Sequence, residues 1–173
     1  MEVYLFPISN KLSKINIKNT IKNNIQSEKL PTAYLSSENF NNEECNNIKA
    51  WGLKKGTSNC KTWNNLKFGD IAIFVEKNNI TITTIKNKIC SEKISKNIWP
   101  SDNTWEFIFF VDFILSKKID KTQFLTDLGY SINDNLMGNR RITSKYINNF
   151  DVRKYKTIDV NSEDVSLEDV NSE

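Results

Sequence analysis

The stretch that decides the fold is AWGLKKGTSNCKTWNNLKFGDIAIFV, which runs from Ala50 to Val75. It places a Trp51-Gly52 pair before a loop rich in Lys, Gly and Asn, and Trp63 follows. A Gly69-Asp70 turn then leads into a run of apolar strand formers, which predicts a buried strand over 71–76. Large aromatic side chains beside a basic loop and a rigid strand are typical of a pocket that stacks a flat ligand.

Short strands and a few helices are expected around this stretch. The pattern predicts strands over 2–8, 71–76, 80–86 and 105–115, with a hairpin turn at Asn78-Asn79. It predicts helices over 16–26, 62–66 and 120–128. Residues 89–94 are expected to extend or follow the sheet, and residues 148–158 to form a closing strand or arm. Together these elements favour an α+β fold with a strongly curved sheet or small barrel.

Charge is distributed unevenly along the 173 residues. Six of the 21 acidic residues lie in 159–173, which has no Lys or Arg, so the first 158 residues hold 24 basic and 15 acidic side chains, a net charge of +9. A basic domain attracts polyanions, nucleic acid first, although lysines can also simply solvate a surface. The acidic end repeats DVNSE and has no aromatic residue, which predicts a disordered tail or a linker.

Cysteine usage and the chain start favour a cytoplasmic protein. Cys45, Cys60 and Cys90 have no CxxC spacing, and the first residues lack the pattern of a secretory signal. No stretch approaches the 18 or so apolar residues of a transmembrane helix. Reduced thiols are therefore expected.

The residue types that catalysis needs are scarce. The chain has no histidine, which removes the commonest general acid–base group and most zinc sites. It also lacks a GxxxxGK[ST] phosphate loop. Asp102, Glu106 and Asp112 are the nearest approach to a nuclease metal site, without the usual spacing. We expect no catalytic residue, no metal and no cofactor; a small enzyme or a protein-interaction module is the remaining alternative class.

The tryptophans are the residues that suggest a ligand. Trp63 and Trp105 adjoin apolar segments and are expected in the core, whereas Trp51 and Trp99 each adjoin a loop of small and polar residues. Two parallel indoles at such loops can sandwich a planar base, with about 1–3 kcal/mol for each stacking contact. On this interpretation Trp51→Ala abolishes ligand preference with a modest loss of stability, whereas Trp63→Ala destabilises the fold by about 3–5 kcal/mol.

Polar groups near the two indoles suggest how a nucleotide would be held. Backbone groups at Gly52 and Leu53 and the side chain of Asn59 are candidates to read the polar edge of a base. Basic side chains are candidates for phosphate contacts, which supply affinity without sequence choice; they are Lys54, Lys55, Arg140, Arg141 and Lys145.

The following residues occur in order along the chain: Trp51-Gly52, Gly56, Asn59, Trp63, Leu66, Gly69-Asp70 and, after an apolar strand, 105–110 (WEFIFF). Over about residues 3–153 this order resembles the EVE/YTH-like branch of the PUA superfamily, in particular the N-terminal domains of McrB-type, modification-dependent restriction proteins. The resemblance implies a PUA-like pseudo-barrel flanked by short helices that flips a modified base, N6-methyladenine or a modified cytosine, into an aromatic cage.

Carried over to this sequence, the resemblance implies Trp51 as one wall of the cage and Trp99 as the other, with Trp105 as the alternative to Trp99. It implies that Gly52 and Leu53 line the pocket through their backbone, and that Gly69 and Asp70 shape the turn before the strand. Residues 1–156 would be the modified-base-binding domain, and 157–173 the tail or linker to a further domain.

The sequence therefore predicts a binding domain for modified double-stranded DNA. A GTPase motor and a nuclease subunit would supply the restriction activity. The alternative is a PUA-like module that binds modified RNA or tRNA, because relatives of this fold use the same kind of cage on methylated RNA.

Overall fold

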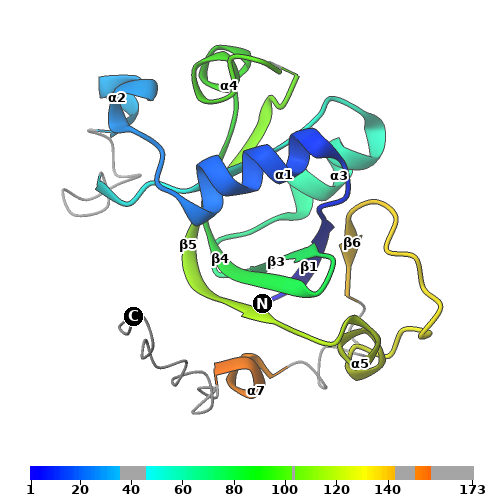
Figure 1. The fold of residues 1–173 in the computed structure, drawn as a ribbon. Coiled ribbons are helices and arrows are strands. Elements are labelled where there is room, and N and C mark those ends of the chain that lie inside the picture. Colours follow the sequence, from blue (N-terminus) through cyan, green and yellow to red (C-terminus); the bar gives the residue numbers. More distant parts are fainter. Residues whose placement is uncertain (36–45, 103, 143–150, 157–173) are drawn as a thin grey trace, which may run out of the picture.

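The computed structural model describes residues 1–35, 46–102, 104–142 and 151–156, and these ranges form one six-stranded sheet with short helices (Figure 1). The strands are β1 (Val3–Pro7), β2 (Ala50–Leu53), β3 (Ile71–Glu76), β4 (Asn79–Cys90), β5 (Phe107–Lys118) and β6 (Arg140–Arg141). The helices are α1 (Lys11–Ile17), the π-helical turn η1 (Lys18–Lys22), the 3₁₀ turn η2 (Ser27–Lys29), α2 (Thr32–Leu35), α3 (Thr57–Asn65), α4 (Glu92–Ile98), α5 (Lys121–Asp127) and α7 (Val152–Lys156).

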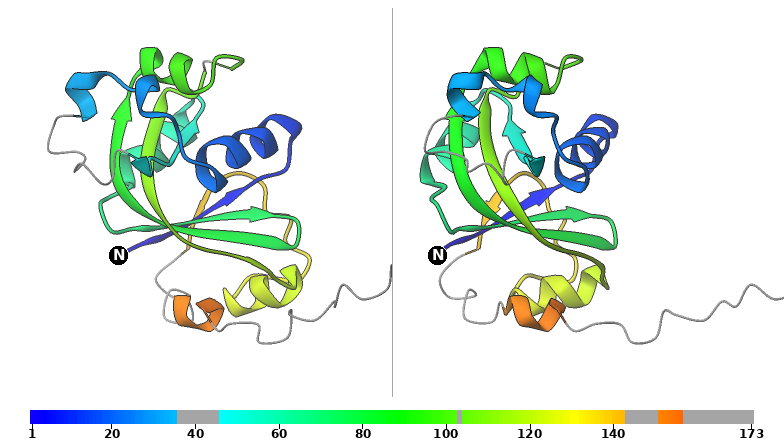
Figure 2. Two further views of the ribbon diagram at one scale, coloured as in Figure 1. Left: turned by 60° about the vertical axis from the view of Figure 1, so that its left-hand side comes forward. Right: turned by 90° about the vertical axis from the view of Figure 1, so that its left-hand side faces the viewer.

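The sheet is mixed and strongly curved. Its strand order is β2-β5-β4-β3-β1-β6, with β1 parallel to β3 and the other neighbouring pairs antiparallel. The register between β4 and β5 shifts twice, at Ile82/Thr83 and at Ile85/Asn87, and such bulges bend the strands that carry them. The long strands β4 and β5 curl across the molecule as a half-barrel (Figure 2). The α+β class and the curved sheet predicted from the sequence are confirmed.

Side chains alternate between two cores, one on each face of the sheet. On β1, Val3 and Leu5 join one core, while Tyr4 and Phe6 join the other, as the period of two residues in a strand requires. The larger core is covered by α1, α3 and α4 and includes three buried tryptophans: Trp51, Trp99 and Trp105. The smaller core is covered by α5, and Figures 1 and 2 place α1 and α5 on opposite sides of the β3–β4 hairpin.

The Gly69-Asp70 turn joins the beginnings of β1 and β3. Gly69 has a φ of 84°, which glycine adopts more readily than other residues. The Asp70 carboxylate is buried and accepts hydrogen bonds from the backbone N–H groups of Glu2 (2.8 Å) and Lys67 (2.9 Å). Both residues therefore have the structural role expected from the sequence.

Three segments differ from the sequence-based expectation. The first helix begins at Lys11, five residues earlier than expected, because the Asn10 side chain accepts a hydrogen bond from Ser13 N and caps it. β4 ends at Cys90, and Ser91 caps α4 through Ile94 N, where the sequence suggested an extension of the sheet. Residues 152–156 form the helix α7 rather than a closing strand.

The β3–β4 hairpin turn also differs from the expected one. Its two loop residues are Lys77 and Asn78, because Glu76 pairs with Asn79 in the ladder. Lys77 has a φ of 47°, in the left-handed region that Gly, Asn and Asp adopt more readily than lysine.

Several sequence-based expectations fall outside the described residues. These are the tail at 157–173, Lys145, Cys45 and both ends of the segment 148–158. Within the described ranges, Cys60 and Cys90 are free thiols and no group of three His, Cys, Asp or Glu residues is placed to hold a metal ion. The described helices also include none long and apolar enough to cross a bilayer.

Candidate nucleic-acid interface

Three tryptophans pack together where β2 meets the segment that follows α4. Trp51 lies on β2 opposite Phe109 of β5, with its ring edge-on to Trp105 at a centroid distance of 5.1 Å and an angle of 86°. Trp99 packs on the other side of Trp105 at 5.9 Å and 36°. Exposed fractions of 3%, 4% and 6% for Trp51, Trp99 and Trp105 place all three in the core.

This arrangement differs from the open cage expected from the sequence. The sequence analysis placed Trp51 and Trp99 as parallel walls at the mouth of a pocket, whereas Trp105 lies between them and contacts both rings. A base between two stacked rings needs a separation of about two van der Waals thicknesses, roughly 7 Å, and neither pair leaves that gap. Trp51 is also well buried, so its removal is expected to cost more stability than the modest loss that the sequence suggested.

Gly52 allows the segment after α4 to lie flat on β2. A Cβ atom at this position would lie 2.8 Å from Trp105 Cβ, 2.9 Å from the Trp105 carbonyl oxygen and 2.9 Å from the Trp99 ring. No larger residue fits without movement of the Trp105 backbone. Gly52 and the neighbouring buried Leu53 thus hold the tryptophans in place, and their contact with a ligand stays a prediction.

A cleft of about 440 Å³ opens beside this cluster, between α1–η1 and residues 98–102. Its volume lies within the range of about 300–1,000 Å³ that small-molecule pockets occupy. Of the three clustered tryptophans, Trp99 lines it; other lining residues are Asn16, Asn19, Thr20, Asn23, Ser101 and Asp102. The π-helical turn η1 forms part of the wall, and such turns often occur at functional sites.

Two donors in this cleft have no partner. The Asn16 Nδ2 group and the Trp99 Nε1 group are buried and make no hydrogen bond within the described part of the chain. A buried polar group left unpaired costs about 1–3 kcal/mol, so native structures seldom retain one without a water or ligand to satisfy it. Both donors are buried beneath the surface of the cleft, so a ligand satisfies them only if these side chains move towards it.

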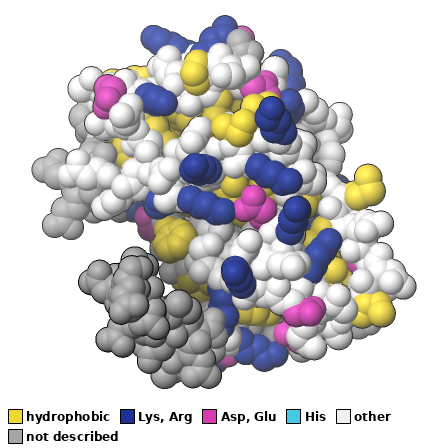
Figure 3. All heavy atoms as spheres, viewed as in Figure 1, with side chains coloured by type: hydrophobic (Ala, Val, Ile, Leu, Met, Phe, Trp, Pro, Cys, Tyr) yellow, Lys and Arg dark blue, Asp and Glu magenta, His cyan; other side chains and the backbone are white. Residues whose placement is uncertain are grey.

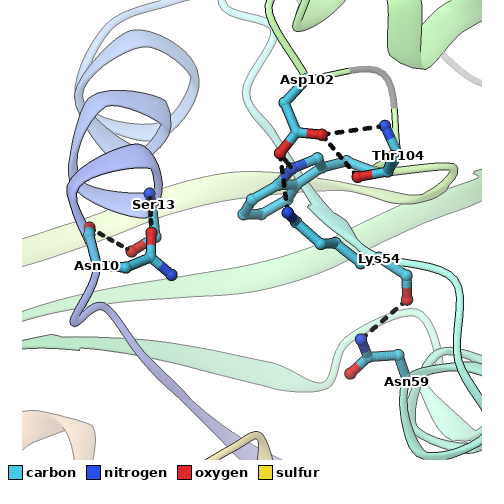
Figure 4. A network of polar contacts seen from close by, with 7 residues as sticks. Asn10, Ser13, Lys54, Asn59, Asp102 and Thr104 are labelled. Atoms are coloured by element: carbon cyan, nitrogen blue, oxygen red, sulfur yellow. Dashed lines mark hydrogen bonds and ion pairs between the residues drawn. The ribbon is translucent and has the colours of Figure 1, made fainter.

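Asp102 fixes one wall of the cleft. Its carboxylate accepts hydrogen bonds from Trp105 Nε1 (2.8 Å) and Thr104 Oγ1 (2.6 Å), and it forms an ion pair with Lys54 Nζ at 3.0 Å (Figure 4). Burial alone would raise the pKa of Asp102, but the hydrogen bonds from Thr104, Trp105 and Lys54 outweigh it and hold that pKa well below its usual range. The ionised carboxylate ties the segment after α4 to the end of β2.

The described basic residues proposed for phosphate contacts are paired within the fold. Lys54 pairs with Asp102, and Lys55 lies 3.6 Å from Glu106. Further round the sheet on β6, Arg140 pairs with Asp134 (2.8 Å) and Arg141 with Glu2 (2.8 Å). β2 and β6 are the two edge strands of the sheet. Their phosphate contacts stay a prediction, and Lys145 lies outside the described residues.

Asn59 braces the fold beside β2. Its Nδ2 group donates to the Lys54 carbonyl (2.9 Å; Figure 4), and its Oδ1 atom accepts from Asn139 Nδ2 (3.0 Å). Asn59 does not line the cleft, and its amide already has partners at both ends. These contacts join α3 to the loop before β6, which closes the open side of the half-barrel.

The carboxylates considered for a nuclease site do not meet. Glu106 precedes β5 and pairs with Lys55, whereas Asp112 lies six residues further along and pairs with Lys86 (3.6 Å). Six residues of a strand span about 20 Å, which is too far for two ligands of one metal ion.

The cleft residues on α1 and η1 were missed, since only a helix over 16–26 was predicted here and no site was assigned to it. Ser13, Asn16 and Thr20 are buried and recur with helical spacing beside Ile17 and Ile21. A row of polar residues next to a row of apolar residues on one helix is the pattern from which this cleft could have been predicted. The chain contains so many asparagines that the polar row does not stand out in the sequence.

A comparison with solved structures matches this chain to the N-terminal domain of Thermococcus gammatolerans McrB bound to m5C DNA. The match has a TM-score of 0.68 at 14% identity, and it covers 90% of this chain and 98% of the other. The two chains therefore share a fold, which confirms the PUA-like, McrB-type architecture expected from the resemblance. No family model matches the sequence, and no curated protein matches it significantly.

Proposed function

We propose that this chain is a DNA-binding domain that recognises a modified base, as the specificity element of a modification-dependent restriction system. The proposal is supported by the fold shared with an McrB N-terminal domain whose solved structure contains m5C DNA. It is also supported by the net charge of +9 over the first 158 residues, which attracts a polyanion. The GTPase motor and the nuclease of such a system are assigned to other domains or subunits.

The base pocket in this proposal is the cleft between α1–η1 and residues 98–102. The observation that carries the assignment is that two residues lining one cleft, Asn16 and Trp99, hold unpartnered donors, Nδ2 and Nε1, buried beneath its surface. A ligand with two acceptors suits two donors. The pairing edge of cytosine offers its ring nitrogen and its carbonyl oxygen, whereas that of adenine offers one ring nitrogen. Methylated cytosine is therefore the first ligand to test, ahead of methylated adenine.

The base has to leave the duplex to reach this cleft. A stacked and paired base cannot present its pairing edge to Asn16, so the proposal includes flipping, which costs a few kcal/mol of unstacking. Phosphate contacts and burial of the base offset that cost. The methyl group adds about 0.8 kcal/mol of apolar burial, or about fourfold in affinity.

The tryptophans have different roles in this proposal. Trp99 lines the cleft and supplies the aromatic contact with the base. Trp105 packs against Trp99 and is held by Asp102, and Trp51 supports Trp105 from the core side. In this proposal Trp99 contacts the base, and Trp105 and Trp51 support Trp99 from inside the fold.

Fluorescence anisotropy with three duplexes tests the proposal. The duplexes are identical except for one 5-methylcytosine, one N6-methyladenine or no modification, and single-stranded RNA of the same sequence serves as competitor. We expect the 5-methylcytosine duplex to bind at least about fourfold more tightly than the unmodified one. Equal Kd values for the three duplexes would refute base recognition, and stronger binding of the RNA would favour the RNA-binding alternative.

A further inference from the structure

Three lysines surround a second, smaller pocket on the other side of α1. The pocket has a volume of about 220 Å³ and is lined by Lys14 of α1, Lys77 of the β3–β4 turn and Lys121 at the start of α5. Pro7, Val75 and Leu136 contribute apolar surface, and no Asp or Glu is among the lining residues. Segments far apart in the sequence therefore bring three cations to one place.

None of the three ammonium groups has an anionic partner within the described ranges of the chain. The nearest acidic residues in the sequence are engaged elsewhere. Glu76 accepts a hydrogen bond from Lys22 Nζ at 2.8 Å, and Asp120 caps α5 through Gln123 N at 2.9 Å. Since like charges repel one another, an anion in this pocket would relieve the repulsion among three unpaired cations.

The backbone at Lys77 gives a second, independent observation. Lys77 occupies the left-handed region with a φ of 47°, which Asn or Gly adopts more readily. Strain of this kind persists mainly where a side chain is needed at that position. The lysine in this turn therefore requires an explanation beyond the folding of the hairpin.

We infer that this three-lysine pocket binds a phosphate group of the DNA backbone next to the flipped base. The inference rests on the proposed function. Asn16 lines the base cleft and Lys14, two residues earlier on the same helix, lines the lysine pocket. One helix thus separates the two pockets, so a strand that crosses α1 reaches both.

The surface between the two pockets suits such a path. Lys11 at the start of α1 and Lys18 at the start of η1 are exposed and make no ion pair within the described residues. Figure 3 shows Lys and Arg side chains gathered across the face on which α1 lies, continuing towards the hairpin. Phosphate contacts on both sides of a flipped base would fix its position over the cleft without reading its sequence.

The test is the salt dependence of binding to the 5-methylcytosine duplex. The variant Lys77→Gln/Lys121→Gln removes two of the pocket charges. Its matched control is Lys61→Gln/Lys67→Gln, which removes two exposed charges from α3 and from the turn at the opposite end of β3. One lost phosphate contact reduces the magnitude of the slope of log K against log salt by about 0.9. The pocket holds one phosphate, so we expect a decrease of about 0.9 for the pocket variant and none for the control.

A single substitution separates binding from folding. Lys77→Asn removes the charge and suits the left-handed backbone, so we expect a higher melting temperature together with a slope reduced by part of the roughly 0.9 due to one phosphate contact. Lys77→Arg keeps the charge and should retain the wild-type slope. If Lys77→Asn and the double pocket variant both keep the wild-type slope of log K against log salt, the inference is overturned.

The outcomes also distinguish this inference from the proposed function. Preference for 5-methylcytosine in the wild type with unchanged slopes in the pocket variants would refute the phosphate pocket alone. Binding without preference, but with the smaller slope in the pocket variants, would refute base recognition and leave the phosphate pocket standing. No binding to any duplex would refute both.

Discussion

Replacement of Asn16 by leucine should stabilise the fold and abolish modified-base recognition. The Asn16 amide is 4% exposed, and its Nδ2 group has no partner among the described residues. An unpaired buried donor costs about 1–3 kcal/mol, and leucine has nearly the same shape without the polar group. We therefore expect the free energy of unfolding to rise by about 1 kcal/mol or more, which for a chain of this length raises Tm by about 2–4 °C per kcal/mol.

Two assays on the same protein test this prediction. Urea unfolding gives the change in the free energy of unfolding, and anisotropy gives Kd for the modified and the unmodified duplex. Asn59→Leu is the matched control, because the Asn59 amide is bonded to Lys54 O and to Asn139 Nδ2. Loss of two hydrogen bonds should destabilise that variant by about 1–3 kcal/mol, the opposite sign to Asn16→Leu.

The reasoning fails if the two variants behave alike. A loss of stability in Asn16→Leu would mean that the amide is bonded in the free protein. Stabilisation without any change in the ratio of the two Kd values would mean that the cleft does not read the base.

Three further predictions follow from the packing. Gly52→Ala should destabilise the fold by about 1–3 kcal/mol and weaken the preference for the modified base, because its Cβ would meet the Trp105 backbone at 2.9 Å. The control is Gly56→Ala, whose Cβ would have nothing within 4 Å, and its stability should lie within about 0.5 kcal/mol of wild type. Trp51→Ala should lower the free energy of unfolding measured in urea by about 3–5 kcal/mol, and Trp63→Ala should lower it by less, because Trp51 is 3% exposed and Trp63 is half-buried. A larger loss for Trp63→Ala than for Trp51→Ala would contradict the argument from burial. The pKa of Asp102 is depressed in the folded state, so its contribution to stability is complete above its unfolded pKa of about 3.9 and is lost as the pH falls towards the folded value. The difference in unfolding free energy between wild type and Asp102→Asn should therefore shrink between about pH 5 and pH 2, and a difference that is independent of pH would show that the carboxylate is not the group responsible.

Four strands, β1, β3, β4 and β5, could be predicted from the sequence because their apolar runs are long and have clear ends, whereas the short strands β2 and β6 were not predicted. The strand expected over 71–76 coincides with β3, and the strand expected over 105–115 contains most of β5. The helix expected over 120–128 corresponds to α5, with Asp120 as its cap. In each of these segments local propensity and tertiary packing favour the same structure.

The helices around the cleft were harder to predict, because polar capping residues set their limits. Asn10 and Ser91 start α1 and α4 at positions that the hydrophobic period alone does not mark. In a chain this rich in asparagine, a helix-capping residue is difficult to distinguish from the polar residues around it.

The sequence drew attention to Trp51, Gly52, Trp99 and Trp105, which the fold brings together, and their role in binding stays a prediction. It placed Trp51 and Trp99 at the surface because each adjoins a polar loop, but the close approach at Gly52 buries the group. Whether the Asn16 donor has a partner depends on which groups pack around it in the folded chain, and the spacing of residues in the sequence does not show this.

The most direct measurement is the structure of this domain in complex with a duplex that carries one 5-methylcytosine. Our account predicts that the methylated base lies outside the helix in the cleft between α1–η1 and residues 98–102, with a base acceptor within hydrogen-bond distance of Asn16 Nδ2. A complex in which that base stays stacked in the duplex, or occupies another part of the surface, would contradict the account.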